Sequence, residues 1–394
     1  MKILRLAPVA FLMIAGIASL RAQEGGGGQQ QDEIITDFGL DEYIYVPKFT
    51  LRLGMRQLSG AKTSFTGRGV VASVVPPDDY TTPNLTRYYH DGTVFKDTRV
   101  IIDNDGFATP INPDGYTNSW SYNYTGQVAD DGNMTFHGYS ADIADPGMRQ
   151  KTANSSFGVE VVVSRDMTQI TKKLSWTLFA GLSLNEINSN RTENLAAKIT
   201  TVTDYYSLNG QTPPAPPYLG PSSTASTVVN SDGTFTTVTS DNTTLLGSSP
   251  LGRTTTVSDG LVSNHWKVKG GYFTFRAGPS LSYAITEKLK ATLSVGAAVV
   301  FVGSTYTVDQ LYTPPVGADI LSTVDDSTDR LLPGYYADAT LEYDFTERAG
   351  AYAGAFYQST GSYDQTIATT EANYATKIDL ASLQGFRLGM NIRF

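Results

Sequence analysis

Apolar residues alternate with polar or small ones in eight separate segments of the chain. The clearest segment is the last, where Phe386, Leu388, Met390, Ile392 and Phe394 share one face and glycine, arginine and asparagine occupy the other. The same period of two marks seven more segments, at 49–55, 157–163, 174–184, 273–283, 293–301, 337–345 and 349–357. Such alternation predicts β-strands with one apolar and one polar face. The chain is therefore predicted to be all-β with an even number of strands.

The connections between these segments alternate in length. Short connections at 165–173, 286–290 and 346–348 separate longer ones at 59–152, 187–264, 308–333 and 363–379. This asymmetry is typical of a closed up-and-down antiparallel transmembrane β-barrel, with short periplasmic turns on one rim and long extracellular loops on the other. We therefore predict eight strands. A ten-stranded variant would recruit 63–74 and 133–139 as strands, but it would place a long connection, 75–132, among the short turns.

Composition and the N-terminus agree with an exported protein. The absence of cysteine excludes disulfides, thiolate metal sites and cysteine nucleophiles. Residues 1–22 combine two early basic residues with an apolar run and a small residue at the end, as in a cleaved signal peptide. We expect 23–44, rich in glycine, glutamine and acids, to form a flexible periplasmic tail, and 45–394 to form the barrel. Removing 1–22 takes away three basic residues and no acidic one, so the formal net charge changes from −9 to −12 and disfavours nucleic acid as a partner.

With these features the chain resembles the small outer-membrane β-barrel proteins of the OmpA/OmpX type. The resemblance covers about 45–58 and 153–394 and rests on pattern: signal peptide, eight alternating strands, short turns opposite long loops and the terminal Phe394. It implies a monomer in the outer membrane of a Gram-negative-type cell, surrounded by outer-membrane lipid and needing no cofactor. It also implies that Phe386, Leu388, Met390, Ile392 and Phe394 form the signal that the outer-membrane assembly machinery reads. The loops at 59–152 and 187–264 exceed those of the minimal family members.

The polar faces of the predicted strands carry charges of both signs. The inward set contains Arg52, Arg56, Glu160, Arg276, Glu342 and Arg387, together with Asp338, Asp344 and Arg393. An eight-stranded barrel is just wide enough for its own side chains to fill the interior. We therefore predict a lumen closed by ion pairs. The alternative is a narrow channel for ions or small solutes, with these charges setting its selectivity.

The first long loop is unusually aromatic. Tyr116, Trp120, Tyr122 and Tyr124 lie among asparagine and serine residues, and could form a face that binds a sugar or a protein whose identity the sequence does not reveal. Alternatively, the strands extend beyond the membrane and these aromatics cover one another. The segment 103–106, Asp-Asn-Asp-Gly, begins like a calcium loop, but its glycine occupies position four where position six is required. An Asp-Gly turn explains it without a metal.

No catalytic, cofactor-binding or metal-binding residue is predicted. The three histidines, His90, His137 and His265, show no spacing that singles out a Ser/His/Asp set. We therefore predict a non-enzymatic structural or surface-interaction role, with a narrow channel or a loop-mediated adhesin as alternatives. A soluble β-sandwich is disfavoured because the apolar faces have the length of membrane-crossing strands.

Overall fold

The computed structural model describes residues 48–102, 108–143, 147–153, 155–221, 223–229, 235–241 and 243–394. The predicted signal peptide (1–22), the predicted tail (23–44) and the candidate calcium segment (103–106) lie outside these residues. Residues 47–394 form one compact unit. Within the described residues, no helix is long and apolar enough to cross a membrane.

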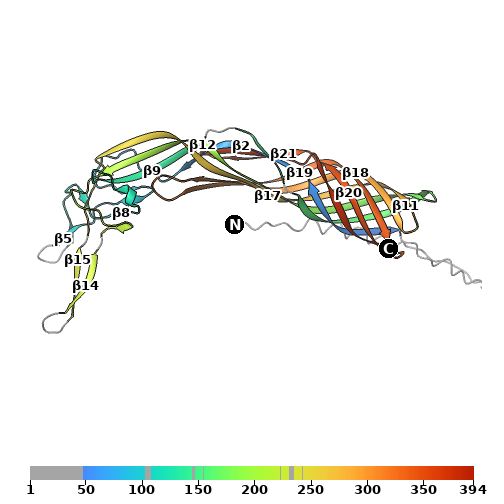
Figure 1. Cartoon of the computed structure of the whole chain (residues 1–394), viewed down its shortest axis with the longest axis horizontal. Helices are drawn as coiled ribbons and strands as arrows, with labels where there is room; N and C mark the ends of the chain where they lie inside the picture. The colour runs from blue at the N-terminus through green and yellow to red at the C-terminus, as the bar shows by residue number, and fades with distance from the viewer. Residues whose placement is uncertain are drawn as a thin grey trace, which may run out of the picture. The chain divides into compact units, whose positions relative to one another are not determined.

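Eight antiparallel strands form a closed ring of hydrogen-bonded pairs (Figure 1). They are β1 (Phe49–Ser59), β11 (Ser156–Thr171), β12 (Leu174–Tyr206), β17 (Gly252–Ala284), β18 (Leu289–Tyr312), β19 (Ile320–Asp344), β20 (Ala349–Ser359) and β23 (Leu383–Arg393). Each pairs with the next in this order, and β23 pairs with β1. All eight predicted segments are therefore strands of this ring. The all-β class is confirmed, and the large antiparallel sheet is consistent with a β-barrel.

The short connections between ring strands are tight turns. They span 172–173, 285–288 and 345–348, and the first is much shorter than predicted because β11 runs on to Thr171. In the last two turns, the hydroxyl oxygens of Thr286 and Thr346 each accept hydrogen bonds from the backbone N–H groups two and three residues later. A threonine oxygen that satisfies turn amides in this way explains why the same residue occurs in both turns.

The predicted long loops are mostly strand, which corrects the loop boundaries. The connection between β12 and β17 is 207–251 instead of 187–264, and that between β18 and β19 is 313–319 instead of 308–333. The segment 363–379 is a hairpin of β21 (Ser362–Ala368) and β22 (Ala372–Asp379). The first loop contributes β2 (Lys62–Ala72), β9 (Met134–Ile143) and β10 (Arg149–Thr152). The sequence offered 63–74 and 133–139 as strands only in the ten-stranded variant, and β21 and β22 were missed because the polar residues Gln365 and Thr376 interrupt their buried faces.

Beyond the ring, the sheet continues in the order β19-β18-β17-β12-β9-β2-β22-β21, which we call the extension. The long strands β12, β17, β18 and β19 belong to both parts (Figure 1). Both segments of the ten-stranded variant are strands, β2 and β9, but they pair within the extension and do not enter the ring.

The polarity of the two strand faces inverts where the ring passes into the extension, while the same face stays buried. On β12 within the ring, Leu182 and Leu184 point outward and are exposed, whereas Asn185 points inward and is buried. Past this level Asn188 is exposed and Ile187 is buried. On β17 the inward residues change in the same way, from Thr274 and Arg276 in the ring to Trp266, Val268 and Val262 in the extension. The ring therefore has an apolar outside and a polar inside, and the extension has the reverse.

The extension has an aromatic core. Phe65 of β2 stacks on Trp266 of β17 and on Tyr306 of β18, with ring centroids 6.0 and 6.1 Å apart. Tyr374 of β22 is fully buried and accepts a hydrogen bond from the Gln310 side chain at 2.7 Å. This core spans both halves of the extension, so burial of apolar area holds β2 and β22 against β17 and β18.

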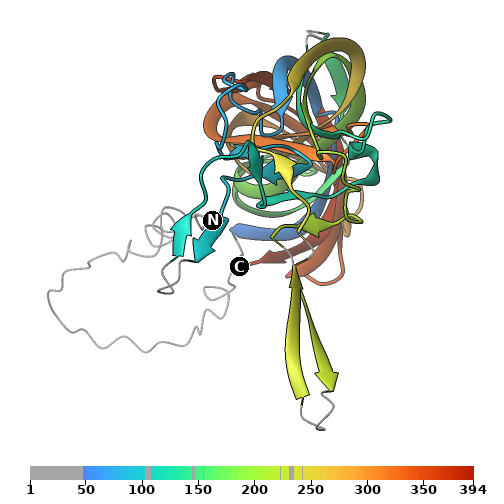
Figure 2. The ribbon, with the colours of Figure 1, turned by 90° about the vertical axis from the view of Figure 1, so that its left-hand side faces the viewer.

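The remaining connections fold into a small module at the far end of the extension strands. Its main sheet contains β3 (Arg87–Tyr88), β4 (Gly92–Val94), β8 (Trp120–Tyr122) and β13 (Tyr218–Leu219). Shorter pairs join β5 (Val100–Ile102) with β6 (Ala108–Pro110), and β7 (Tyr116–Thr117) with β16 (Leu246–Gly247). A 3-10 helix covers Thr125–Gln127. The hairpin of β14 (Ser223–Val229) and β15 (Phe235–Asp241) is a separate two-stranded ribbon (Figure 2).

Candidate functional site

The charged residues predicted to face the lumen meet inside the ring. Arg276 of β17 contacts Glu160 of β11 at 2.6 Å, and Arg52 of β1 contacts Glu342 of β19 at 2.6 Å. Both pairs join strands that are not neighbours in the ring. Arg276 and Glu160 are almost completely buried. Period-two alternation placed these side chains on the inner face correctly, but only closure of the ring brings the partners together.

Glu160 is the centre of one network. Besides Arg276, its carboxylate contacts Arg387 of β23 at 3.6 Å and accepts a hydrogen bond from the Tyr352 hydroxyl at 3.0 Å. Arg387 also pairs with Asp338. Tyr352 reaches across the interior because β1 carries Gly54 at the facing position, where a Cβ would lie 2.1 Å from the tyrosine oxygen.

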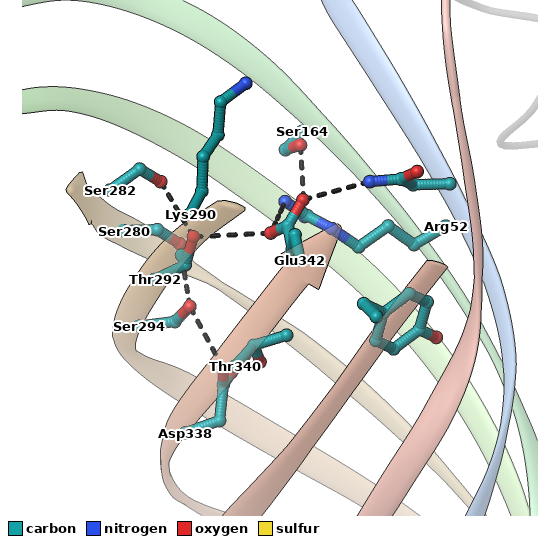
Figure 3. A network of polar contacts seen from close by, with 12 residues as sticks. Arg52, Ser164, Ser280, Ser282, Lys290, Thr292, Ser294, Asp338, Thr340 and Glu342 are labelled. Atoms are coloured by element: carbon teal, nitrogen blue, oxygen red, sulfur yellow. Dashed lines mark hydrogen bonds and ion pairs between the residues drawn. The ribbon is translucent and has the colours of Figure 1, made fainter. Parts of the chain in front are cut away.

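A second network surrounds Glu342 (Figure 3). One carboxylate oxygen accepts hydrogen bonds from Arg52 at 2.6 Å and from the Thr292 hydroxyl at 3.3 Å, and the other accepts one from Asn391 at 3.0 Å. Hydroxyl groups extend the network along the wall, from Ser294 to Asp338 at 3.3 Å. Glu342 therefore has hydrogen-bond donors on both oxygens, a charged and a neutral one on the first and a neutral one on the second, as buried carboxylates require.

Arg56 differs from the other arginines of the cluster. Its guanidinium donates to the Ser183 hydroxyl at 2.6 Å and to the Gln358 carbonyl oxygen at 3.4 Å, and it lies 4.0 Å above the ring of Phe356. A neutral hydrogen-bonded and cation–π environment thus holds this cation. Tyr352, Thr292, Asn391 and Gln358 were not anticipated as members of these networks; Tyr352 and Asn391 lie at inward positions of predicted strands, whereas Thr292 and Gln358 lie one residue outside the predicted segments.

The C-terminal strand β23 pairs with β1 and so closes the ring, and its apolar side chains lie on the outer face. Phe386, Leu388, Met390, Ile392 and Phe394 are all exposed on the outer face. The backbone of Phe394 exchanges two hydrogen bonds with Phe49, at 2.9 and 3.0 Å, and the two rings stack with centroids 6.1 Å apart. Residues 49 and 394 thus complete the seam between the first and last strands. Recognition of this segment by an assembly machinery stays a prediction.

The aromatic residues of the first loop form a core within the module. Trp120 and Tyr122 are buried and stack with centroids 5.6 Å apart, and Tyr218 packs on Trp120 at 4.7 Å. Of the four residues proposed as a binding face, only Tyr116 and Tyr124 are partly exposed. The arrangement favours the packing interpretation for Trp120 and Tyr122.

Asp114, near the candidate calcium loop, accepts hydrogen bonds from Arg99 at 2.6 and 2.9 Å, which lowers the pKa of Asp114.

A buried polar cluster joins the module to the extension. The Tyr89 hydroxyl donates to Asp204 at 2.6 Å and lies 2.8 Å from the Tyr206 hydroxyl, while Arg253 pairs with Asp204 at 2.6 Å. Burial raises the pKa of Tyr206 to about 12 and raises the pKa of Tyr89 above its usual range.

These shifts predict an alkaline loss of stability where the module joins the extension. Because the folded state holds the tyrosine protons more tightly than the unfolded state, their contribution is complete below roughly pH 10 and is lost as the pH rises through the folded pKa. Near-ultraviolet circular dichroism between neutral pH and about pH 12 should record this loss. Tyr206→Phe should make the decline shallower, at a cost of about 1 kcal/mol near neutral pH for the lost hydrogen bond. An unchanged alkaline profile would contradict this assignment.

Comparison with known proteins gives only distant structural similarity. No protein-family model matches the chain, and no curated protein matches it. Among solved structures, the chain is similar to the outer membrane protease OmpT from Escherichia coli, with 10% identity, coverage of 88% of this chain and 97% of that chain, and a TM-score of 0.27. It is also similar to Ail, the attachment invasion locus protein of Yersinia pestis, with 9% identity, coverage of 86% and 99%, and a TM-score of 0.19. A Pseudomonas aeruginosa FadL homologue has 9% identity, coverage of 88% and 90%, and a TM-score of 0.19.

At such low identities and TM-scores, these similarities carry no inference about the activity or partners of this chain. The class rests on the chain's own geometry: an all-β protein whose large antiparallel sheet is consistent with a β-barrel. Strands of 24 to 33 residues distinguish it from a minimal OmpA/OmpX-type barrel, in which one strand needs only about 9–11 residues to cross the bilayer.

Proposed function

We propose that the chain is an integral outer-membrane protein, an eight-stranded barrel that displays the extension and its module at the cell surface. Its role is structural or surface-interacting, without catalysis. The observation that carries the proposal is the inversion of the polarity of the buried and exposed faces on strands that belong to both parts. The apolar outer face and polar interior of the ring fit a surrounding of lipid. The polar outer face and apolar core of the extension fit a surrounding of water.

The dimensions of the ring support this placement. Strands β1, β20 and β23 each have 11 residues, about the length that a tilted strand needs to cross the hydrocarbon core. Exposed tyrosines mark both ends of the apolar surface: Tyr283 and Tyr343 lie beside the short turns, and Tyr335 and Tyr357 lie beside each other at the opposite end. Outer-membrane barrels carry such aromatic girdles at both interfaces.

The contents of the ring favour a closed lumen over a channel. Its charges are engaged in the two networks around Glu160 and Glu342, and Arg56 is held by neutral groups. An aqueous channel is typical of wider barrels, whereas eight strands leave an interior that side chains fill. We also propose that the outer-membrane assembly machinery reads the C-terminal strand during insertion, since its apolar outer face is unbroken to the last residue.

Heat-modifiable mobility tests this proposal directly. The detergent-refolded chain should migrate differently in gels before and after boiling, native protein should fractionate with outer membranes, and planar bilayers containing it should show no conductance. Steady conductance that changes on charge reversal of Arg276 or Glu342 would replace the closed lumen with a narrow channel. A chain that stays soluble without detergent and shows no mobility shift would refute the membrane placement.

A further inference from the structure

The outer wall of the ring carries an apolar furrow. It has a volume of about 680 Å³ and runs over β18, β19, β20 and β23, at the end of the ring that adjoins the extension. One row across these four strands consists of Leu293, Ala339, Ala355 and Phe386. Two neighbouring alanines between a leucine and a phenylalanine make the floor of the furrow lower than its sides. The furrow is thus a depression in the surface assigned above to lipid.

A polar groove lies on the outer face of the extension. It has a volume of about 530 Å³ and runs over β2, β21 and β22, beside β10. Its floor contains small side chains, since Ser64 and Thr66 of β2 lie next to Ala375 of β22. Four charged side chains surround this floor, and they are Lys62, Asp364, Lys377 and Asp379.

The groove and the furrow are neighbours along the same strands. After two or three intervening residues, β1 continues into β2, β20 into β21, and β22 into β23. Ser59 lines the furrow and Lys62 lines the groove, and three residues of chain span at most about 11 Å. Tyr357 lines the furrow and donates a hydrogen bond to the Ala381 carbonyl at 3.3 Å. Because Tyr357 belongs to the aromatic girdle, the furrow lies on the membrane side of the girdle and the groove on its water side.

An apolar furrow that leads into a polar groove matches the shape of an amphiphile. An acyl chain would fill the furrow, and the headgroup attached to it would lie in the groove. Because the surroundings of the furrow are already apolar, the acyl chain gains close packing there and no removal from water. Selection among lipids therefore falls to the headgroup.

The charges around the groove specify that headgroup. Lys62 lies opposite Asp379 across one ladder, and Asp364 lies opposite Lys377 across the next. In the part of the chain that the structure describes, none of these four side chains is in an ion pair. Two cations and two anions complement a headgroup that carries one phosphate and one ammonium group. A headgroup with phosphate alone would place its negative charge beside two carboxylates, which is unfavourable.

From these observations we infer that the furrow and the groove together bind one phospholipid with a zwitterionic headgroup. Its phosphate lies beside Lys62 and Lys377, and its ammonium group lies beside Asp364 and Asp379. A second copy of the chain fits less well, because a twofold contact would set one furrow against the other and leave both unfilled. The inference deepens the proposed function by naming a ligand class, and it rests on the proposed membrane placement.

The test uses the full mature chain, refolded in detergent and verified by its gel shift. Native mass spectrometry follows the binding of phosphatidylethanolamine, which carries a phosphate and a primary amine. The matched probe is phosphatidylglycerol with the same acyl chains, which carries the phosphate without the amine. One phosphatidylethanolamine should bind per chain, about fivefold more tightly than phosphatidylglycerol, as expected for exposed charge contacts. Equal or tighter binding of phosphatidylglycerol would refute the headgroup assignment.

A pair of substitutions tests the furrow. Ala339→Leu with Ala355→Leu, which lie opposite each other on β19 and β20, fills the floor and should weaken the binding of both lipids about tenfold or more. The control is Ala180→Leu with Ala277→Leu, which lie opposite each other on β12 and β17. It adds the same volume to another part of the outer wall and should leave binding unchanged. Binding that survives the first pair, or that falls equally with the second, would overturn the inference.

Two further pairs test the headgroup contacts. Asp364→Asn with Asp379→Asn should remove the preference for phosphatidylethanolamine, because the carboxylates that favour the ammonium group are lost. Lys62→Gln with Lys377→Gln should weaken the binding of both lipids about fivefold, since both lipids carry the phosphate. A preference that persists without the carboxylates would contradict the assignment.

The control for charge is Lys267→Gln with Lys269→Gln, on the outer face of β17. It removes two positive charges away from the groove and should change the binding of neither lipid. An equal effect of these lysines would mean general attraction, and a dimer without bound lipid would make the furrow a contact between copies; either result overturns the inference. A chain with an intact gel shift that binds neither lipid refutes this inference alone, whereas loss of the shift refutes the proposed barrel.

Discussion

Glu160→Gln should destabilise the folded protein by roughly 3–5 kcal/mol, the cost of removing one partner from a buried ion pair. The substitution keeps the shape of the side chain but removes the charge that Arg276 contacts at 2.6 Å and Arg387 at 3.6 Å. Of the ion pairs that these two guanidinium groups make within the described residues, only that of Arg387 with Asp338 would remain. Urea unfolding in lipid vesicles, followed by the fraction of protein with folded gel mobility, measures the effect.

The matched control is Asp259→Asn, the same type of change in an exposed pair. Asp259 contacts Lys198 at 2.5 Å, but both side chains are largely in water, so the expected cost is at most about 1 kcal/mol. Adding Arg276→Met to Glu160→Gln should recover much of the lost stability, because replacing both charged partners with groups of similar volume is often close to neutral. A cost below about 1 kcal/mol for Glu160→Gln would mean that water enters the lumen and screens these charges.

Val161→Arg is expected to cost about 2–4 kcal/mol in a bilayer, the range for a basic residue at the lipid-facing midplane of a barrel. Val161 lies on the outer face of β11, opposite Leu53 of β1 and Leu182 of β12, near the middle of the apolar surface. The same vesicle unfolding assay applies. The large effect arises because the charge must leave water for hydrocarbon or distort the bilayer.

Asn188→Arg on β12 provides the comparison, since it places the same residue on an outward face beyond the inversion level. A surface substitution of this kind should change stability by no more than about 0.5 kcal/mol. Equal effects of the two substitutions would place the outer face of the ring in water. The difference between them therefore places the membrane boundary between the level of Val161 on β11 and that of Asn188 on β12.

The membership of the ring could be predicted from the sequence. Each of its strands has an apolar outer face that alternates with glycine, serine or charged residues, and β23 carries this pattern to Phe394. The same parity placed Arg52, Glu160, Arg276 and Glu342 on the inner face. These features are local, since they follow from the period of a strand and from the lengths of the short turns.

The extension could not be predicted from the sequence, because its core forms only through tertiary contacts. Its inward residues also alternate, as Val262, Trp266 and Val268 do on β17, but Asn264 interrupts the apolar face. The strands that cover this core, β2, β9 and β22, come from segments that are distant in the chain. Likewise, Trp120 and Tyr122 became core residues only because Tyr218, about a hundred residues later, packs against them.

The sequence by itself therefore determined which residues share a face, and the tertiary structure decided what lies on each side of that face. Alternation with a period of two residues indicates that the two faces of a strand differ. The same alternation occurs in a strand with lipid on its apolar side and in a strand whose apolar side faces a protein core. Closure of the ring by β1 and β23 turns the apolar faces outward. In the extension, the strands β2, β9, β21 and β22 complete a second enclosure around the inward faces, so there the apolar side chains are buried.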